Sequence, residues 1–131
     1  EEPCFWGSQY FIENYNFNKD HIVVNINVEM CGKRDKGNWG TTAIGPENLK
    51  DYFLNTDPLS VKYLDLENNS EKYKGSDQLS FYRKDIPAIR FGNLDYPEKH
   101  TSRDDISIID FRYLENLAET LYNITNEIAN H

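Results

Sequence analysis

The chain has 131 residues, and its 22 acidic and 14 basic side chains give it a net charge of −8. This charge argues against nucleic acids and anionic membrane surfaces as partners, because both repel an acidic protein. Disordered chains rarely carry as many aromatic residues as the nine Tyr, seven Phe and two Trp found here. We therefore expect one folded, soluble domain, and no apolar run approaches the roughly 20 residues of a membrane span.

The start of the sequence and its two cysteines bear on processing. The chain opens at Glu1 and Glu2 without an initiator Met and without the basic and apolar stretches of a signal peptide. We therefore expect a fragment, a processed product or a chain whose leading part precedes this sequence.

Cys4 and Cys31 are too few for a disulfide framework. A single bridge would favour an oxidising compartment, and two free, partly buried thiols explain the sequence as well.

The first elements are a short helix and a long strand. Residues 7–15 predict a helix with Tyr10, Phe11 and Tyr15 as its inward positions. Residues 21–30 predict the main strand. Their nearly continuous β-branched run is typical of a strand that is covered on both faces in a parallel sheet.

The middle of the chain is more polar. Residues 32–45 predict a Gly-rich loop. Pro46 opens a predicted helix that runs to about residue 54, because proline suits an early helical position. Residues 59–66 predict another strand, and residues 67–75 predict a polar connector.

The last third of the chain contains the clearest helix. Ser76 and Asp77 predict the cap of a short helix to about residue 82. Residues 86–91 predict a strand, and residues 93–105 predict a polar loop. Asp110 is the predicted N-cap of the final helix. The apolar residues of that helix recur at three- and four-residue steps, at Leu114, Leu117, Ala118, Leu121, Ile124 and Ile128.

Alternating strands and helices predict an α/β fold with a mainly parallel sheet, whose chemistry lies beyond the carboxyl ends of its strands. Glu29 ends the main strand, and His100 follows the strand at residues 86–91. Glu1 and Glu2 precede the first helix. We expect these side chains to converge at one edge of the sheet. Oxygen and imidazole ligands suit zinc, and a carboxylate beside a metal-bound water can act as general base.

Each candidate also has a second interpretation. On composition alone, Glu1 and Glu2 are better explained as a solvated terminus. Glu29 needs a partner at the end of a buried strand, and a helix N-terminus or an Arg would satisfy it as a metal would. His100 is a single histidine, which is weak support for a ligand. Spacing alone therefore does not establish a metal site.

Four segments of the chain carry recognisable motifs. Residues 1–8 are similar to a Glu-Glu-x-Gly-x-x-Gly-Ser motif, and residues 25–32 to an Asn-x-Asp-Met-x-Gly strand end. Residues 76–88 resemble a Ser-Asp-His…Phe…Ile-Pro-Ala stretch, and residues 99–104 a Tyr-His-Thr-x-x-Asp loop. In this order the four motifs resemble those of one family of zinc aminopeptidases, which includes bacterial leucyl aminopeptidases, glutamate carboxypeptidase and glutaminyl cyclases. The resemblance implies a three-layer α/β sandwich, incomplete at its N-terminal side, with residues 1–131 as the C-terminal part of a single zinc-peptidase domain.

The resemblance also implies roles for individual residues. Glu1 matches the catalytic general base. Glu2 and His100 match ligands of one zinc, and Glu29 matches a ligand of the second. We expect Asp104 to orient His100, with capping of the following segment as the alternative. Asp77 is assigned a similar supporting role, with capping of its helix as the alternative.

Several positions depart from the family pattern. Glu29 stands where the family usually has Asp, and Gln78 replaces a His. Cys4 replaces a Gly, and Lys99 replaces the Tyr before the ligand His. Cys4 and Cys31 each lie two residues after a proposed ligand, on segments that the family places close together, so a bridge between them is a reasonable hypothesis. We accordingly expect a secreted or periplasmic protein.

The implied function is that of a metal-dependent exopeptidase that hydrolyses N-terminal peptide bonds with a zinc-activated water. The complete domain would hold two zinc ions, act on peptides and bind neither nucleic acid nor membrane. The family also uses a His and a bridging Asp upstream of the Glu-Glu motif. We therefore expect this chain to need the N-terminal segment of the same domain as its partner and to be inactive alone. The alternatives are a non-catalytic peptidase-like binding module and a glutaminyl cyclase.

Overall fold

A four-stranded sheet forms the middle layer of the structure. The computed structural model describes residues 4–15, 21–33, 41–55, 61–93 and 96–130. The strands are β1 (Asn25–Glu29), β2 (Thr41–Gly45), β3 (Val61–Asp65) and β4 (Ala88–Gly92), in the order β1-β4-β2-β3. β1 runs parallel to β4 and β2 parallel to β3, whereas β2 and β4 are antiparallel. The α/β fold with a mainly parallel sheet is therefore confirmed.

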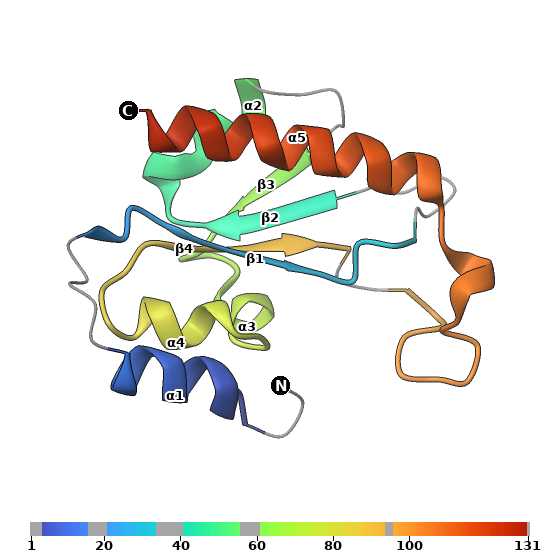
Figure 1. Ribbon diagram of the computed structural model, residues 1–131, viewed down its shortest axis with the longest axis horizontal. Helices are drawn as coiled ribbons and strands as arrows, with labels where there is room; N and C mark the ends of the chain where they lie inside the picture. Colours follow the sequence, from blue (N-terminus) through green and yellow to red (C-terminus); the bar gives the residue numbers. More distant parts are fainter. Residues whose placement is uncertain (1–3, 16–20, 34–40, 56–60, 94–95, 131) are drawn as a thin grey trace.

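Helices cover both faces of this sheet (Figure 1). α2 and α5 lie on one face, α3 and α4 lie on the other, and α1 packs outside α4. Two single turns of 3-10 helix, η2 and η3, precede α2 and α5. The bounds of these elements are α1 (Trp6–Asn14), η2 (Glu47–Leu49), α2 (Lys50–Asn55), α3 (Ser70–Tyr73), α4 (Gln78–Tyr82), η3 (Ile106–Ile108) and α5 (Phe111–Ala129).

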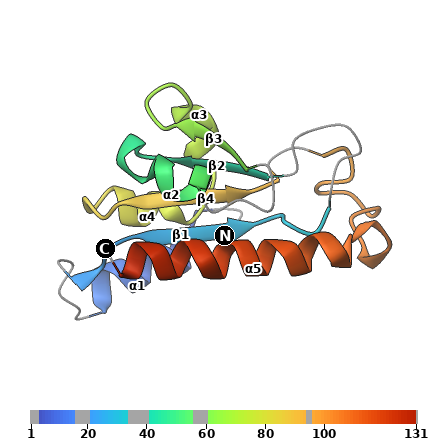
Figure 2. The same ribbon diagram turned by 90° about the horizontal axis from the view of Figure 1, so that it is seen from above.

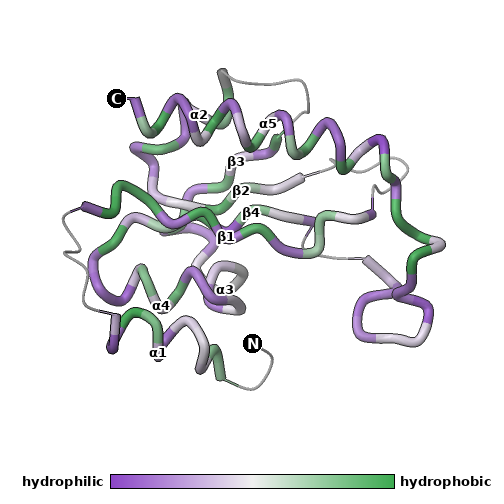
Figure 3. The backbone as a smooth tube through the Cα atoms, in the orientation of Figure 1, coloured by the Kyte–Doolittle hydropathy of each residue, from purple (hydrophilic) through white to green (hydrophobic). Residues whose placement is uncertain are grey.

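The long helix α5 provides most of one helical layer and lies alongside β1 when the sheet is seen from above (Figure 2). Its N-cap is Asp110, whose carboxylate accepts a hydrogen bond from the backbone nitrogen of Tyr113 at 2.9 Å. One side of the helix is apolar and the other polar (Figure 3). Its buried residues are Tyr113, Leu117, Thr120, Ile124 and Ile128. The predicted cap and helix are confirmed, although Ala118 lies on the exposed side.

The core consists of two clusters, one on each face of the sheet. The larger cluster joins α2 and α5 to the sheet around Phe53, Phe91 and Ile124. On the opposite face, Ile44 and Tyr73 form the centre of the smaller cluster. No described helix is long and apolar enough to span a membrane.

The predicted loop at residues 32–45 is wrong at its end, because Thr41–Gly45 is the inner strand β2. Ala43 and Ile44 are completely buried. The hydroxyl of Thr41 is hydrogen-bonded to the hydroxyl of Tyr113, so even the polar start of the strand has a partner in the core. Residues 34–40 of the same predicted loop lie outside the described residues.

The main strand is shorter than predicted. β1 comprises five residues, and it forms one edge of the described sheet. Val23 and Val28 are 61% and 45% exposed. The expectation that this strand is covered on both faces therefore holds in part. Ile26 packs against the core cluster on the α5 side and Asn27 is hydrogen-bonded on the α4 side, whereas Val28 stays open at the edge.

The first helix is also oriented differently from the prediction. Tyr10, Phe11 and Tyr15, the predicted inward positions, are 70%, 40% and 65% exposed. The helix faces α4 instead through the hydroxyls of Ser8 and Ser80, which are 2.9 Å apart. The physical reason is that α1 packs on another helix, where the ring centres of Phe11 and Phe81 lie 6.1 Å apart, so that Phe11 alone of the three is turned inward in part.

The remaining predictions agree with the structure in outline. η2 and α2 occupy the predicted helix at residues 46–54, β3 lies in the predicted strand at residues 59–66, and β4 overlaps the one predicted at residues 86–91. The predicted connector at residues 67–75 contains the short helix α3. Asp77 occupies the N-cap position of α4, but no side-chain hydrogen bond caps that helix.

Candidate active site

The carboxyl ends of β1 and β4 meet at one edge of the sheet. Because the two strands are parallel, Glu29 at the end of β1 is the register partner of Gly92 at the end of β4. A side chain at Gly92 would overlap the carbonyl oxygen of Glu29. Glycine therefore lets the two strand ends approach each other beside the site.

A cavity of about 520 Å³ opens at this edge. Its lining residues are Phe5, Glu29, Met30, Gly75, Arg90, Tyr96, Lys99, His100 and Asp104. Three of them have left-handed backbone conformations, with φ values of 53° at Phe5, 50° at Met30 and 58° at His100. Such strain in residues other than glycine is concentrated at functional sites. Here Met30 directly follows the candidate ligand Glu29, and His100 is itself a candidate ligand.

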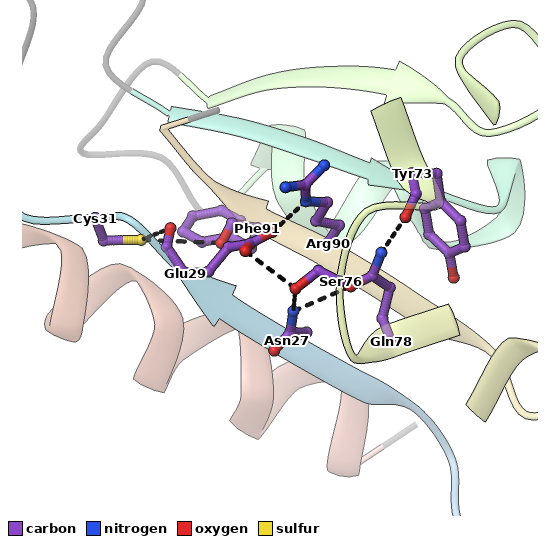
Figure 4. Close-up of polar contacts among 8 residues, drawn as sticks. All are labelled: Asn27, Glu29, Cys31, Tyr73, Ser76, Gln78, Arg90 and Phe91. Carbon is purple, nitrogen blue, oxygen red and sulfur yellow. Dashed lines mark hydrogen bonds and ion pairs between the residues drawn. The ribbon is translucent and has the colours of Figure 1, made fainter. Parts of the chain in front are cut away.

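Two side chains hold the Glu29 carboxylate in place (Figure 4). Arg90 Nε donates a hydrogen bond to Oε1 and forms an ion pair with it. Ser76 Oγ donates to Oε2 at 3.0 Å. The side chains of Arg90 and Glu29 are only 8% and 15% exposed, so the pair is largely withdrawn from water.

A second row of polar contacts supports Ser76. Asn27 Nδ2 donates to Ser76 Oγ at 2.8 Å and to Gln78 Oε1 at 3.0 Å. Gln78 Nε2 in turn donates to the carbonyl oxygen of Tyr73. Asn27 and Glu29 lie two residues apart on β1 and therefore point to the same face of the sheet. The network connects the carboxylate to the start of α4 (Figure 4).

The loop that carries His100 is fixed to the segment after β1. Lys33 forms an ion pair with Glu98, and its ammonium group lies 5.7 Å from the ring centre of Tyr96. The hydrogen bond from Lys33 lowers the pKa of Glu98. The hydroxyl of Tyr96 donates to Asp104 at 2.9 Å, and desolvation together with that bond raises the pKa of Tyr96 to about 12. The imidazole of His100 is thus presented by an anchored loop.

The structure brings some of the sequence-predicted residues together and not others. Glu29, His100 and Asp104 line the same cavity. Asp77 is not among its lining residues and lies at the start of α4. Glu1 and Glu2 lie outside the described residues.

The hypothesis of a bridge between Cys4 and Cys31 is not met, because both are free thiols. Cys4 is exposed. Cys31 Sγ donates instead to the carbonyl oxygen of Glu29 at 3.1 Å. Burial raises the pKa of the Cys31 thiol to about 11.

Sequence reasoning missed Arg90, although it allowed that an Arg could satisfy Glu29. The signal was present in the strand at residues 86–91, where one charged residue interrupts an apolar run. A buried guanidinium needs a carboxylate partner, and Glu29 is the acidic residue at the end of the adjacent strand.

The donor chemistry of the cavity fits a zinc ion in part. Glu29 supplies carboxylate oxygen and His100 supplies imidazole nitrogen, which are both zinc ligands in proteins. Each Glu29 oxygen accepts one of the two hydrogen bonds described above and retains a second lone pair. Carboxylate ligands are ordinarily hydrogen-bonded in this way. Among the described residues, however, no group of three or more His, Cys, Asp or Glu side chains could hold a metal ion.

Comparisons with known proteins place the chain among peptidases. The model of peptidase family M28 matches residues 1–125. The LapA aminopeptidase of Legionella pneumophila is 21% identical with a TM-score of 0.74, and the match covers 97% of this chain and 37% of that one. BSAP, a zinc aminopeptidase from Bacillus subtilis, is 16% identical with a TM-score of 0.75, covering 96% and 33%. This chain therefore spans about a third of these structures, whose likeness shows the fold. The search of curated proteins finds no match.

Proposed function

This chain belongs to peptidase family M28, and from that premise we propose that residues 1–131 form the C-terminal part of a metal-dependent exopeptidase domain. The observation that carries the proposal is that Glu29 and His100, on segments distant in the sequence, line one cavity at the carboxyl ends of parallel strands. The proposed substrates are peptides with a free N-terminus. The proposed cofactor is zinc, with two ions in the complete domain.

The chain's own residues have distinct parts in this proposal. Glu29 and His100, together with Glu2, would hold the metal, and Glu1 would be the general base. Zinc, when bound, supplies a Lewis acid for the scissile carbonyl and an activated water. Ser76 orients the carboxylate of Glu29, and the bond between Tyr96 and Asp104 joins the two sides of the loop that contains His100. Both contacts reduce the freedom of the ligands before a substrate arrives.

Hydrolysis of amino-acid anilides by the complete protein that contains this chain tests the proposal. We expect His100→Ala to lower kcat/KM by about 100-fold or more, because it removes a proposed metal ligand. Glu29→Gln should lower it by less than about tenfold, because Arg90 already pairs with that carboxylate. Glu115→Gln is the matched control, since Glu115 is an exposed carboxylate on α5, and it should leave the rate unchanged. Equal rates for the His100 variant and the wild type would contradict the proposal.

We further propose that the 131-residue chain alone is inactive, because the family whose motifs it resembles also uses a His and a bridging Asp upstream of the Glu-Glu motif. After dialysis against trace zinc, the isolated chain should retain fewer than two equivalents of the metal. Two tightly held equivalents per chain would refute this. A secreted or periplasmic location stays a prediction, and the free thiols of Cys4 and Cys31 remove the bridge that supported it.

A non-catalytic peptidase-like module is the second candidate, and one observation favours it. Arg90 already neutralises the charge of Glu29 without a metal. An ion pair of this kind is also expected in a site with a purely structural role. The anilide assay separates the two candidates, because a binding module hydrolyses nothing in the wild type or in any variant. Cyclisation of a peptide with N-terminal glutamine, measured beside it, would indicate a glutaminyl cyclase.

A further inference from the structure

Arg90 is a buried cation in the middle of the sheet. It lies on β4, between β1 and β2 in the strand order, and is 7% exposed. Its register partner on β1 is Asn27, two residues before Glu29. Arg90, Asn27 and Glu29 therefore lie on the same face of the sheet, with Arg90 and Glu29 as diagonal neighbours. The strand register itself brings the two charges together.

The ion pair lies in the cavity where the metal is proposed to bind. Arg90 and Glu29 both line the cavity that His100 also lines. The guanidinium packs over Gly75, where an added side-chain carbon would lie 3.6 Å from Arg90 Nη1. The carboxylate of Glu29 contacts Arg90 within this cavity.

We infer that Arg90 is a built-in counter-cation of Glu29, which keeps the metal-free site neutral and weakens the binding of a divalent metal at this carboxylate. The inference rests on the proposed metal-facing role of Glu29 and His100. A metal at Glu29 would lie close to a fixed positive charge, and like charges repel strongly in a site with little water. Glu29 should therefore contribute at least about tenfold less to zinc affinity than a carboxylate without a paired cation would.

A double-mutant cycle in chelator-containing buffer tests the pairing without any metal. Arg90→Met should lower Tm by about 10 °C, because it leaves a carboxylate buried without its cation. Arg90→Met/Glu29→Gln should regain most of that loss, because the buried charge is then removed as well. Equal Tm values for the single and double variants would overturn the inference.

Addition of zinc alone then tests the effect on metal binding. Zinc should raise the Tm of Arg90→Met, and Glu29→Gln in the same background should abolish that rise. When Arg90 is present, Glu29→Gln should leave the zinc-induced rise in Tm unchanged. The inference would be overturned if zinc raised the Tm of the wild type as much as that of Arg90→Met and if Glu29→Gln alone abolished the rise.

Calorimetric titration keeps the test decisive if Arg90→Met does not fold. Wild type and Glu29→Gln should then bind zinc with affinities within about threefold of each other, and a tenfold or larger loss in Glu29→Gln would overturn the inference. Failure of the proposed function looks different, since His100→Ala would then leave zinc binding unchanged. Even if the proposed function fails in this way, the difference in Tm between Glu29→Gln and wild type in chelator-containing buffer still reports on the ion pair.

Discussion

Glu29 illustrates how a single carboxylate depends on residues that are distant in the sequence. Arg90 is 61 positions away and Ser76 is 47 positions away, yet both donate to its oxygens. Each partner comes from a different element, β4 or the segment before α4. The position of this carboxylate is therefore a property of the assembled sheet and not of the local sequence.

Ser76 is the residue through which this network can be tested. The residue is 1% exposed, and its hydroxyl accepts from Asn27 and donates to Glu29. Ser76→Ala should lower the free energy of unfolding by about 1–3 kcal/mol, because Asn27 and Glu29 each lose a hydrogen bond in a site with little water. Urea denaturation measures the loss, and Ser102→Ala, at an exposed serine, should change stability by less than about 0.5 kcal/mol. A neutral Ser76→Ala would mean that water replaces the hydroxyl.

At the scale of the elements, Gly92 links strand pairing to the site. A methyl group there would overlap the backbone of Glu29 on the adjacent strand. Gly92→Ala should therefore destabilise the protein by about 3 kcal/mol, because backbone atoms cannot move aside as a flexible side chain can.

Gly7 on α1 is the matched control for this substitution, since an added carbon there meets nothing within 4 Å. Gly7→Ala should be neutral or stabilise by about 0.5–1 kcal/mol through its helix propensity. Thermal unfolding of both variants compares them directly. If Gly92→Ala unfolds at the wild-type temperature, the close approach of β1 and β4 is wrong.

The sequence predicted elements well where their pattern is long. α5 has 19 residues with an apolar face and the cap Asp110, so its periodicity was readable. β2 was missed because its five residues follow a Gly-rich stretch, and only the tertiary structure shows them to be buried. Candidate ligands were found from motifs, whereas Arg90 and Ser76 were not connected to Glu29, because no local spacing encodes a contact between strands.

At the scale of the whole molecule, the buried phenols and the thiol make the fold sensitive to alkali. Burial raises the pKa of Cys31 from 9.0 to about 11. Burial also raises the pKa values of Tyr63 and Tyr73 above their usual range. The unfolded chain loses each of these protons at a lower pH than the folded chain. Stability is therefore complete below about pH 9 and falls as the pH rises from there towards 11.

Cys31 should account for a measurable part of that fall. With pKa values of 9.0 unfolded and about 11 folded, its thiol lowers stability by about 2 kcal/mol between pH 8 and pH 10.5. Urea denaturation at both pH values should show a smaller loss for Cys31→Ala than for wild type. Cys4→Ala is the matched control, since Cys4 is exposed, and it should lose as much as wild type. An equal loss in Cys31→Ala would show that the thiol is ionised as readily in the folded chain as in the unfolded one, and its burial against β1 and β4 would be wrong.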